Sequence, residues 1–266
     1  MPSDNAFDRT VDLSPASGPL DDQRPGWRAM AELMRRPQPV TVPMVLLFAI
    51  VPLYLYIPEL FGDRTVHVPE LPLDRAIPLR PAWSVVYGSL FLAALLPVLV
   101  LHQQELVRRT ILAFLFTWLF SYAVFLAYPT VGNRPEVVPG DGFFEWTLRL
   151  VYASDHRYNC FPSLHVAQCF LAAFACHRVH RGVGAVAGIW AMLVALSTLF
   201  IKQHYVLDAI SGALLAYVAY GVFLRAYPRE DIPAHERRLA PALAAGAFAL
   251  YGFVVFGLLL LYVGAG

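Results

Sequence analysis

The strongest constraint on this fold is a series of seven long apolar runs, at residues 41–61, 82–102, 109–128, 163–180, 183–201, 205–226 and 240–264. A helix needs about 20 apolar residues to cross the hydrocarbon core of a bilayer. The chain is 58% hydrophobic and only 15% charged, which is too apolar for an ordinary soluble domain. We therefore expect an all-α, polytopic membrane helix bundle in which each run forms one span.

The runs divide the 266 residues into three parts. Residues 1–40 are rich in Pro, Asp and Arg and have no apolar core of the kind that a cleavable signal peptide requires. We expect them to form a cytoplasmic tail with a short amphipathic helix near residues 27–34. Residues 41–226 then form the membrane core, and residues 227–266 form a cytoplasmic loop and one extra C-terminal span.

Arginines orient the expected spans. They gather before the first span and between spans two and three, four and five, and six and seven: Arg24, Arg28, Arg35, Arg36, Arg108, Arg109, Arg178, Arg181, Arg225, Arg229, Arg237 and Arg238. By the positive-inside rule these four segments face the cytoplasm. The connections at 129–162 and 201–204 then lie outside, so we expect an integral protein of a bacterial inner or plasma membrane whose active site is extracytoplasmic.

An amphipathic stretch at 143–152 carries aromatic residues suited to the headgroup layer. We expect it to lie flat on the external surface. It serves either as an interfacial anchor or as a rim that guides a lipid sideways into the site.

His204 and Asp208 are four residues apart and would share one face of a helix. The carboxylate can then accept the Nδ1 proton of the imidazole and leave Nε2 as a directed lone pair, which is the arrangement of an oriented nucleophile. Asp208 would also stabilise positive charge on the ring after attack on phosphorus. The alternative is that the pair is only a buried polar bridge between spans.

A second histidine, His165, follows Pro162 and Ser163 at the start of the fourth run. Proline suits the first turn of a helix and serine can cap it, so we expect free backbone N–H groups to form an anion site here. His165 would then donate a proton to the departing oxygen of a phosphate ester. Otherwise it is a histidine satisfied by a neighbouring span.

Two cations accompany the histidines. Arg134 lies on an external connection, and arginine suits bidentate phosphate binding. Lys202 is the only lysine among the twenty Lys and Arg residues, and it lies two residues before His204. Because phosphoryl transfer needs positive charge on the equatorial oxygens, both are candidate phosphate ligands.

A metal centre is not expected. The three cysteines at 160, 169 and 176 show no metal-ligand spacing and no disulfide framework. His204 and Asp208 alone supply two ligands, and no carboxylate-rich cluster completes a site.

These motifs resemble a known family. Asn133-Arg134-Pro135, Pro162-Ser163-Leu164-His165 and the stretch from Ser197 through His204 to Asp208 are similar to the three signature motifs of the type 2 phosphatidic acid phosphatase superfamily, which includes vanadium haloperoxidases. The resemblance implies a metal-independent six-helix core without a cofactor. It also implies that His204 is the nucleophile, Asp208 its partner and His165 the acid, with Arg134 and Ser163 as phosphate ligands.

The chain departs from the family pattern at two cations. Ala127 takes the place of the lysine seven residues before Arg134, and Thr198 takes the place of the arginine after Ser197. Lys202, one helical turn beyond Thr198, could supply one of the missing charges. We therefore include Lys202 among the expected phosphate ligands.

Leu164 stands where many family phosphatases have glycine. Together with Asp155, Asn159 and His204-Tyr205, it is similar to the inositol phosphorylceramide synthase branch, which transfers phosphoalcohol groups between lipids. We include Leu164 in the expected phosphate-binding set, although it can equally pack against a neighbouring helix.

The leading interpretation is a lipid phosphate phosphatase that cleaves a phosphomonoester or diphosphate through a phosphohistidine, without a cofactor. A phosphotransferase that moves a phosphoalcohol headgroup between lipids is the first alternative. A transporter or binding protein for an anionic headgroup is another, although it has no need of a paired His and Asp together with a proton donor. The expected partners are a lipid phosphate and the bilayer, not nucleic acid.

Overall fold

The computed structural model describes residues 42–61 and 64–265. Within these ranges the secondary structure is helical, with two isolated bridges and no strand. The expectation of an all-α fold is therefore confirmed. The expected tail at 1–40 and its helix near residues 27–34 lie outside the described residues.

The described helices follow the apolar runs. In chain order they are α2 (Val42–Ile50), α3 (Leu53–Tyr56), η2 (Ile57–Phe61), α4 (Pro72–Ala76), α5 (Trp83–Gly88), η3 (Ser89–Phe91), α6 (Leu92–Val100), α7 (Gln104–Ala127), α8 (Phe143–Ser154), α9 (Leu164–Val179), α10 (Arg181–Phe200), α11 (Val206–Ala219), η4 (Tyr220–Leu224) and α12 (Ala234–Ala265). Here η2 and η3 are 3₁₀ turns, and η4 is a π-helical turn.

Five of the described helical segments are long and apolar enough to cross a membrane: Trp83–Val100, Gln104–Ala127, Arg181–Phe200, Val206–Leu224 and Ala234–Gly264. Two further apolar helices are shorter, Leu46–Leu60 and Leu164–Val179. All seven runs are therefore helical, which fits an integral membrane protein. The first run is not one continuous helix, because the chain turns at Val51 and Pro52 and proline has no N–H for the helical ladder.

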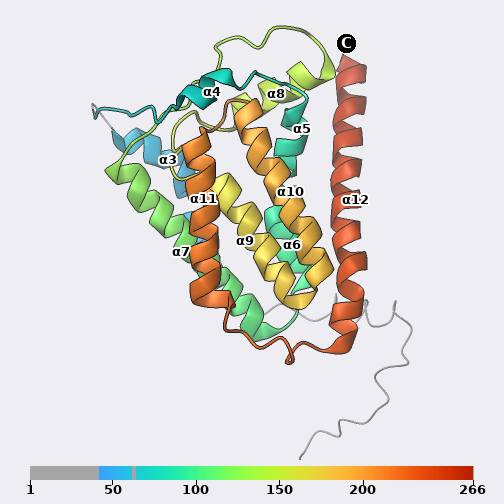
Figure 1. Ribbon diagram of the computed structural model, residues 1–266. Helices are drawn as coiled ribbons and strands as arrows, with labels where there is room; N and C mark the ends of the chain where they lie inside the picture. The colour runs from blue at the N-terminus through green and yellow to red at the C-terminus, as the bar shows by residue number, and fades with distance from the viewer. Residues whose placement is uncertain (1–41, 62–63, 266) are drawn as a thin grey trace, which may run out of the picture. The chain divides into compact units, whose positions relative to one another are not determined.

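Helix α9 lies in the middle of the bundle and packs against α6, α7, α10 and α11 (Figure 1). Small buried side chains, including Ala172, Ala173 and Ala175, cover much of it, and small residues let helix backbones approach closely. At Gly184, α10 comes so near that an added Cβ would lie 2.3 Å from the Cβ of His177. The helix that carries His165 is thus held on several sides.

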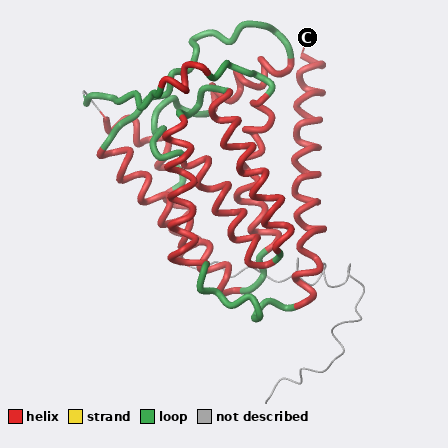
Figure 2. Tube along the Cα trace, viewed as in Figure 1, coloured by secondary structure: helices red, strands yellow, loops and turns green. Residues whose placement is uncertain are grey.

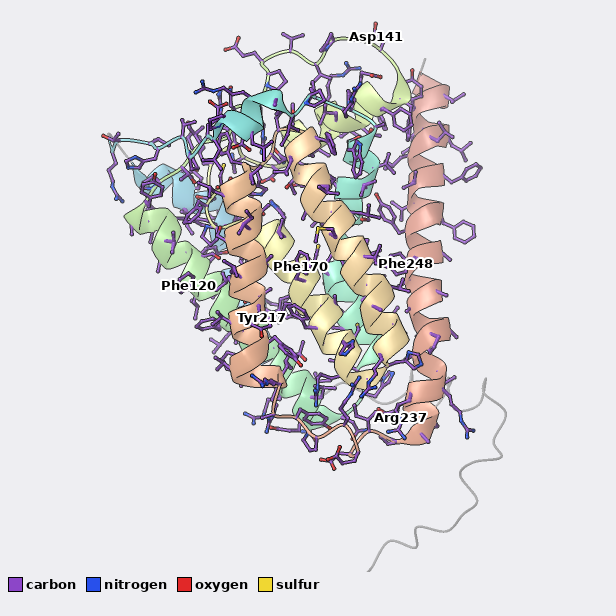
Figure 3. The ribbon with its side chains drawn as sticks, viewed as in Figure 1. Phe120, Asp141, Phe170, Tyr217, Arg237 and Phe248 are labelled. Atoms are coloured by element: carbon purple, nitrogen blue, oxygen red, sulfur yellow. The ribbon has the colours of Figure 1, made fainter. Side chains whose placement is uncertain are left out.

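Loops gather at the two ends of the bundle (Figure 2). One end carries α4, α8 and the long connection from α7 to α8 (Figure 1). Asp141 of that connection lies at this end, and Arg237 lies at the opposite end (Figure 3).

The arginine-bearing connections meet at the Arg237 end. Arg178 donates to the carbonyl oxygen of Tyr227, and Arg229 Nε donates to the carbonyl oxygen of Arg178 at 3.2 Å. The guanidinium of Arg109 lies 5.8 Å from the ring centroid of Tyr227. Three of the four segments that orient the chain therefore share one end of the bundle; the fourth lies outside the described residues.

Helix α12 runs along the outer side of the bundle and packs on α6, α8 and α10 (Figure 1). Tyr251 donates to the carbonyl oxygen of Val85, and Tyr262 donates to that of Asp141 at 2.6 Å. Most of its remaining surface, including Phe253, is apolar and exposed. Such a surface is suited to contact with lipid.

Candidate active site

Two histidines from different elements face each other at the end of the bundle that carries α4 and α8. A hydrogen bond of 2.9 Å joins Nδ1 of His165, in the first turn of α9, to Nε2 of His204, which precedes α11. The side chain of His165 is 14% exposed and that of His204 only 3%. The structure therefore brings together the two histidines on which the sequence analysis depends.

Asp208 lies on the other side of His204. Its Oδ2 is 3.5 Å from Nδ1 of His204 and accepts a hydrogen bond of 2.8 Å from the backbone N–H of Tyr205. Nδ1 therefore faces a carboxylate while Nε2 faces His165, but no hydrogen bond joins Nδ1 to Asp208, so the oriented nucleophile stays a prediction. The two residues do not share a helix, however. Helix α11 begins at Val206, so Asp208 lies within it and His204 lies before it. The hydrogen bond from Tyr205 to Asp208 caps the helix and brings the preceding chain close to the carboxylate.

Ser163 is the N-cap of α9. Its hydroxyl oxygen accepts a hydrogen bond from the N–H of Val166 at 3.3 Å, and Pro162 precedes the cap. The expected cap is confirmed, but the helix begins at Leu164, so the proline lies outside the first turn. The N–H of Ser163 donates to the carbonyl oxygen of Asp208 at 3.0 Å. This bond fixes the start of α9 against α11, and hence one histidine against the other.

Arg134 lies beside the histidines and is largely buried. It donates to the carbonyl oxygens of Asp155 at 2.7 Å and His156 at 2.5 Å. Its guanidinium lies 5.1 Å from the ring centroid of Tyr152, whose pKa is raised by burial to about 12. A neutral phenol ring suits this cation–π contact. Arg134 thus sits at the site, where it holds the backbone after α8.

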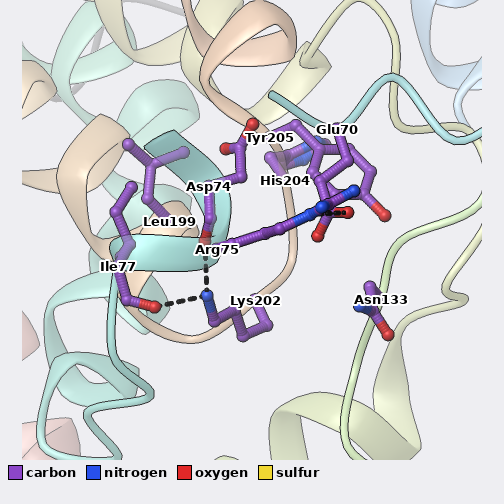
Figure 4. Close-up of a pocket in the computed structure, with 9 residues that line it drawn as sticks. All are labelled: Glu70, Asp74, Arg75, Ile77, Asn133, Leu199, Lys202, His204 and Tyr205. Carbon is purple, nitrogen blue, oxygen red and sulfur yellow. Dashed lines mark hydrogen bonds and ion pairs between the residues drawn. The ribbon is translucent and has the colours of Figure 1, made fainter. Parts of the chain in front are cut away.

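Lys202 points toward α4. Its Nζ donates to the carbonyl oxygens of Asp74 at 3.0 Å and Ile77 at 2.5 Å, at the C-terminal end of that helix (Figure 4). Its φ of 56° lies in the left-handed region that few residues other than glycine adopt. The only lysine of the chain therefore contacts backbone carbonyls, and the expected contact with a phosphate stays a prediction.

A cavity of about 280 Å³ lies between α4 and the turn that carries His204 (Figure 4). Its lining is mainly polar: Glu70, Asp74, Arg75, Ile77, Asn133, Leu199, Lys202, His204 and Tyr205. The carboxylate of Asp74 already has a hydrogen-bond partner in the protein, because its Oδ1 accepts a hydrogen bond of 2.8 Å from the N–H of Val206. Glu70 Oε2 accepts a hydrogen bond of 2.9 Å from Nε of Arg75, so a ligand in this cavity would meet an ion pair and Asn133.

Leu164 is buried, in a cluster with Ile57, Trp118, Tyr122 and Phe125. Its side chain therefore packs, which is the alternative that the sequence left open. Only its backbone N–H, in the first turn of α9, could serve a phosphate.

A carboxylate that the sequence analysis did not select lies against His165. Oδ2 of Asp155, just after α8, is 3.6 Å from Nε2 of His165. Tyr54 donates to its Oδ1 at 3.2 Å, while Tyr87 and Gln203 donate to its Oδ2 at 3.0 and 3.1 Å. The sequence signals were weak: Asp155 only shared a branch resemblance, and Gln203 only adjoins His204.

Among the described residues, Cys160, His204 and Asp208 place one possible metal-ligand atom each within 4.8 Å of one another. Spacing along the chain gave no sign of this group. Burial and the nearby Asp208 raise the pKa of the Cys160 thiol far above its ordinary value. A protonated thiol is a poor metal ligand, so the donor set does not fit a resident metal ion well.

Comparisons with known proteins bear on the family to which the chain belongs. A sequence profile of the PAP2 superfamily matches residues 66–222, a range that contains Arg134, His165, His204 and Asp208. A PA-phosphatase related-family protein of Dictyostelium discoideum is 24% identical over 120 residues, which cover 41% of this chain but only 22% of that relative. No solved structure matches the chain. Because the profile covers more than half of its length, the chain belongs to the PAP2 superfamily.

Proposed function

We propose that this protein is an integral membrane phosphatase that hydrolyses a lipid phosphomonoester or diphosphate through a phosphohistidine. The contact of 2.9 Å between His165 and His204 is the observation that carries the proposal. One phosphoryl group could meet both imidazoles, and the two rings come from different elements. A binding protein has no need of this arrangement.

In the first step, Nε2 of His204 attacks phosphorus, and an N–P bond forms as the P–O bond to the leaving group breaks. Asp208 stabilises the positive imidazole that results. The departing oxygen takes its proton from His165. In the second step, His165 removes a proton from water as the water oxygen bonds to phosphorus, the N–P bond breaks, and inorganic phosphate leaves.

The phosphate ligands in this proposal are the backbone N–H groups that start α9 and the guanidinium of Arg134. A helix N-terminus favours anions because its first N–H groups have no partner within the helix. Arg134 lies close to the histidines, because its Nη2 is 3.9 Å from Oδ2 of Asp155, and that oxygen is 3.6 Å from Nε2 of His165. Its guanidinium can therefore contribute positive charge to a phosphate bound there. Lys202 would join this set only if it released α4.

The site is proposed to face the extracytoplasmic side. The connections rich in arginine share the opposite end of the bundle, and such connections are retained in the cytoplasm. A lipid phosphate in the outer leaflet would then reach the histidines from the headgroup layer.

The test is a panel of phosphate-labelled lipids incubated with the purified protein in nanodiscs. We expect free phosphate, and rapid quenching should trap a phosphoenzyme that is stable in base and lost in acid. His204→Ala should abolish the trapped label and reduce turnover by on the order of 10³-fold or more. The matched control is His156→Ala, an exposed histidine whose contact with Arg134 uses its backbone oxygen. Wild-type turnover in His204→Ala would refute the nucleophile assignment.

The polar cavity beside His204 favours a second candidate, a phosphotransferase. A cavity of about 280 Å³ lined by Glu70 and Asn133 has room for a hydroxylated acceptor larger than water. In that case an acceptor hydroxyl attacks the intermediate in place of water, and label appears in a second lipid without free phosphate. The same panel separates the two functions when both products are measured.

A further inference from the structure

We propose that Asp155 is a positioning residue for His165 and forms with it a second histidine–carboxylate pair, opposite that of His204 and Asp208. This inference rests on the proposed function, because it assigns a role within the same reaction. It differs from the sequence analysis, in which His165 acts alone.

The first support is the geometry of the His165 ring. Nε2 lies 3.6 Å from Oδ2 of Asp155, while Nδ1 is bonded to His204. A carboxylate beside one ring nitrogen of a histidine holds a proton on that nitrogen. His165 is therefore directed to exchange protons with substrate through Nδ1, the atom that faces His204.

The second support is the set of groups that hold Asp155. Hydroxyls of Tyr54 and Tyr87 and the side-chain amide of Gln203 converge on its two oxygens. An ionised carboxylate only accepts hydrogen bonds, so three donors match this form. They come from α3, α5 and the turn before α11, so the position of Asp155 is fixed by three separate elements and by Arg134 at its own carbonyl oxygen.

The third support is that Asp155 and its donors enclose His165. Tyr87 OH lies 3.4 Å from the same Nε2, and the rings of Tyr54 and Tyr87 meet the imidazole edge-on. The ring is thus held against rotation. The side chain of Asp155 is only 13% exposed, and its Oδ2 lies 3.6 Å from the imidazole that must donate a proton.

The consequence concerns the leaving group. Help from a general acid matters most when the departing oxygen is a poor leaving group, as in an alkyl phosphate, and least when it is an aryl oxygen. A residue that acts through His165 should therefore affect the two substrate types unequally. A residue that only supports the fold should affect both equally.

The experiment compares Asp155→Asn with wild type on an alkyl lipid phosphate and on p-nitrophenyl phosphate. We expect kcat/KM, which reports the step that breaks the P–O bond, to fall roughly 10- to 100-fold for the alkyl substrate, less than the full effect of a general acid. The aryl substrate should lose only a few-fold, and its trapped phosphoenzyme should persist. The matched control is Asp141→Asn, a fully exposed aspartate on the connection that precedes α8, which should leave both rates unchanged.

Equal losses on the two substrates, or none, would overturn the inference. If Asp155→Asn does not fold, Tyr87→Phe removes one donor to Asp155 and its hydroxyl contact with His165. This variant should lose less activity than Asp155→Asn, and the loss should again be larger on the alkyl substrate than on the aryl substrate. A uniform loss would again overturn the inference. The proposed function fails separately, if wild type neither releases phosphate nor forms the labelled enzyme on either substrate.

Discussion

Replacing Gly212 with alanine should push apart the two helices that position the histidines. Gly212 lies in α11, where an added Cβ would be 2.4 Å from the carbonyl oxygen of Ser163 and 3.3 Å from its Cβ. Ordinary van der Waals contact begins near 3.4 Å, so the start of α9 must withdraw by about 1 Å. The clash involves backbone, which cannot rotate out of the way.

The size of the effect follows from that displacement. His165 lies two residues after Ser163, so it moves with the clash, while His204 stays with α11 and Asp208. A misplacement of about 1 Å at reacting groups can reduce a rate by about 10²-fold. Overpacking costs about 1–3 kcal/mol of stability, and the better helix propensity of alanine offsets about 1 kcal/mol of this. We therefore expect kcat to fall roughly 10- to 100-fold, with a small change in melting temperature.

The assay is phosphate release from a lipid phosphate in nanodiscs, with thermal unfolding followed on the same samples. Gly221→Ala is the matched control, because an added Cβ there meets no atom within 4 Å. It should keep wild-type kcat. Wild-type kcat in Gly212→Ala, with both variants folded, would show that the contact between α9 and α11 does not set the distance between the histidines.

Two further predictions concern Lys202 and metal ions. Lys202→Met should lower the free energy of unfolding by about 1–3 kcal/mol, measured by thermal or denaturant unfolding, because Nζ holds the C-terminal end of α4. A raised KM with unchanged stability would instead indicate a phosphate ligand. Phosphate release should continue in EDTA, because the proposed nucleophile is an imidazole and not metal-bound water; complete loss restored by a divalent ion would contradict the mechanism.

The helices were predictable because apolar runs record them directly, but their ends were not. Helix α7 begins at Gln104, five residues before the expected run at 109–128. Its first turn is charged, and Glu105 pairs with Arg108 and Arg109 at 2.8 and 2.7 Å. Ion pairs within one helix turn favour helix, whereas hydropathy alone excludes these residues.

The core of the site was predictable for a related reason. Ionisable side chains at the ends of apolar runs are costly unless they have a role, which singled out His165, His204 and Asp208. Tyrosines in apolar runs carry no such signal, because they also occur at membrane interfaces. Tyr54 and Tyr87 were therefore missed, since only the packing of α3 and α5 turns their hydroxyls toward Asp155.

Lys202 shows how a rare residue can mislead when position is judged along the chain. Its distance of two residues from His204 suggested a shared ligand, but the backbone at Lys202 has a φ of 56° and the side chain reaches α4. Asp74 of α4 makes a second contact with this turn, because its Oδ1 accepts a hydrogen bond from the N–H of Val206 at the start of α11. Helix α4 is therefore fastened to both sides of the turn that carries the proposed nucleophile.

Under the proposed function, the two carboxylates would hold the histidines while a phosphate enters between them. In this structure the inner nitrogens of His165 and His204 satisfy each other, and a phosphate must replace that hydrogen bond, worth about 1 kcal/mol, with contacts to both rings. The outer nitrogens face Asp155 and Asp208 at 3.6 and 3.5 Å. Each ring thus contacts a carboxylate through its outer nitrogen, while its inner nitrogen can exchange the other histidine for a phosphate. Removing either carboxylate should therefore disturb one step of the reaction more than the binding of phosphate.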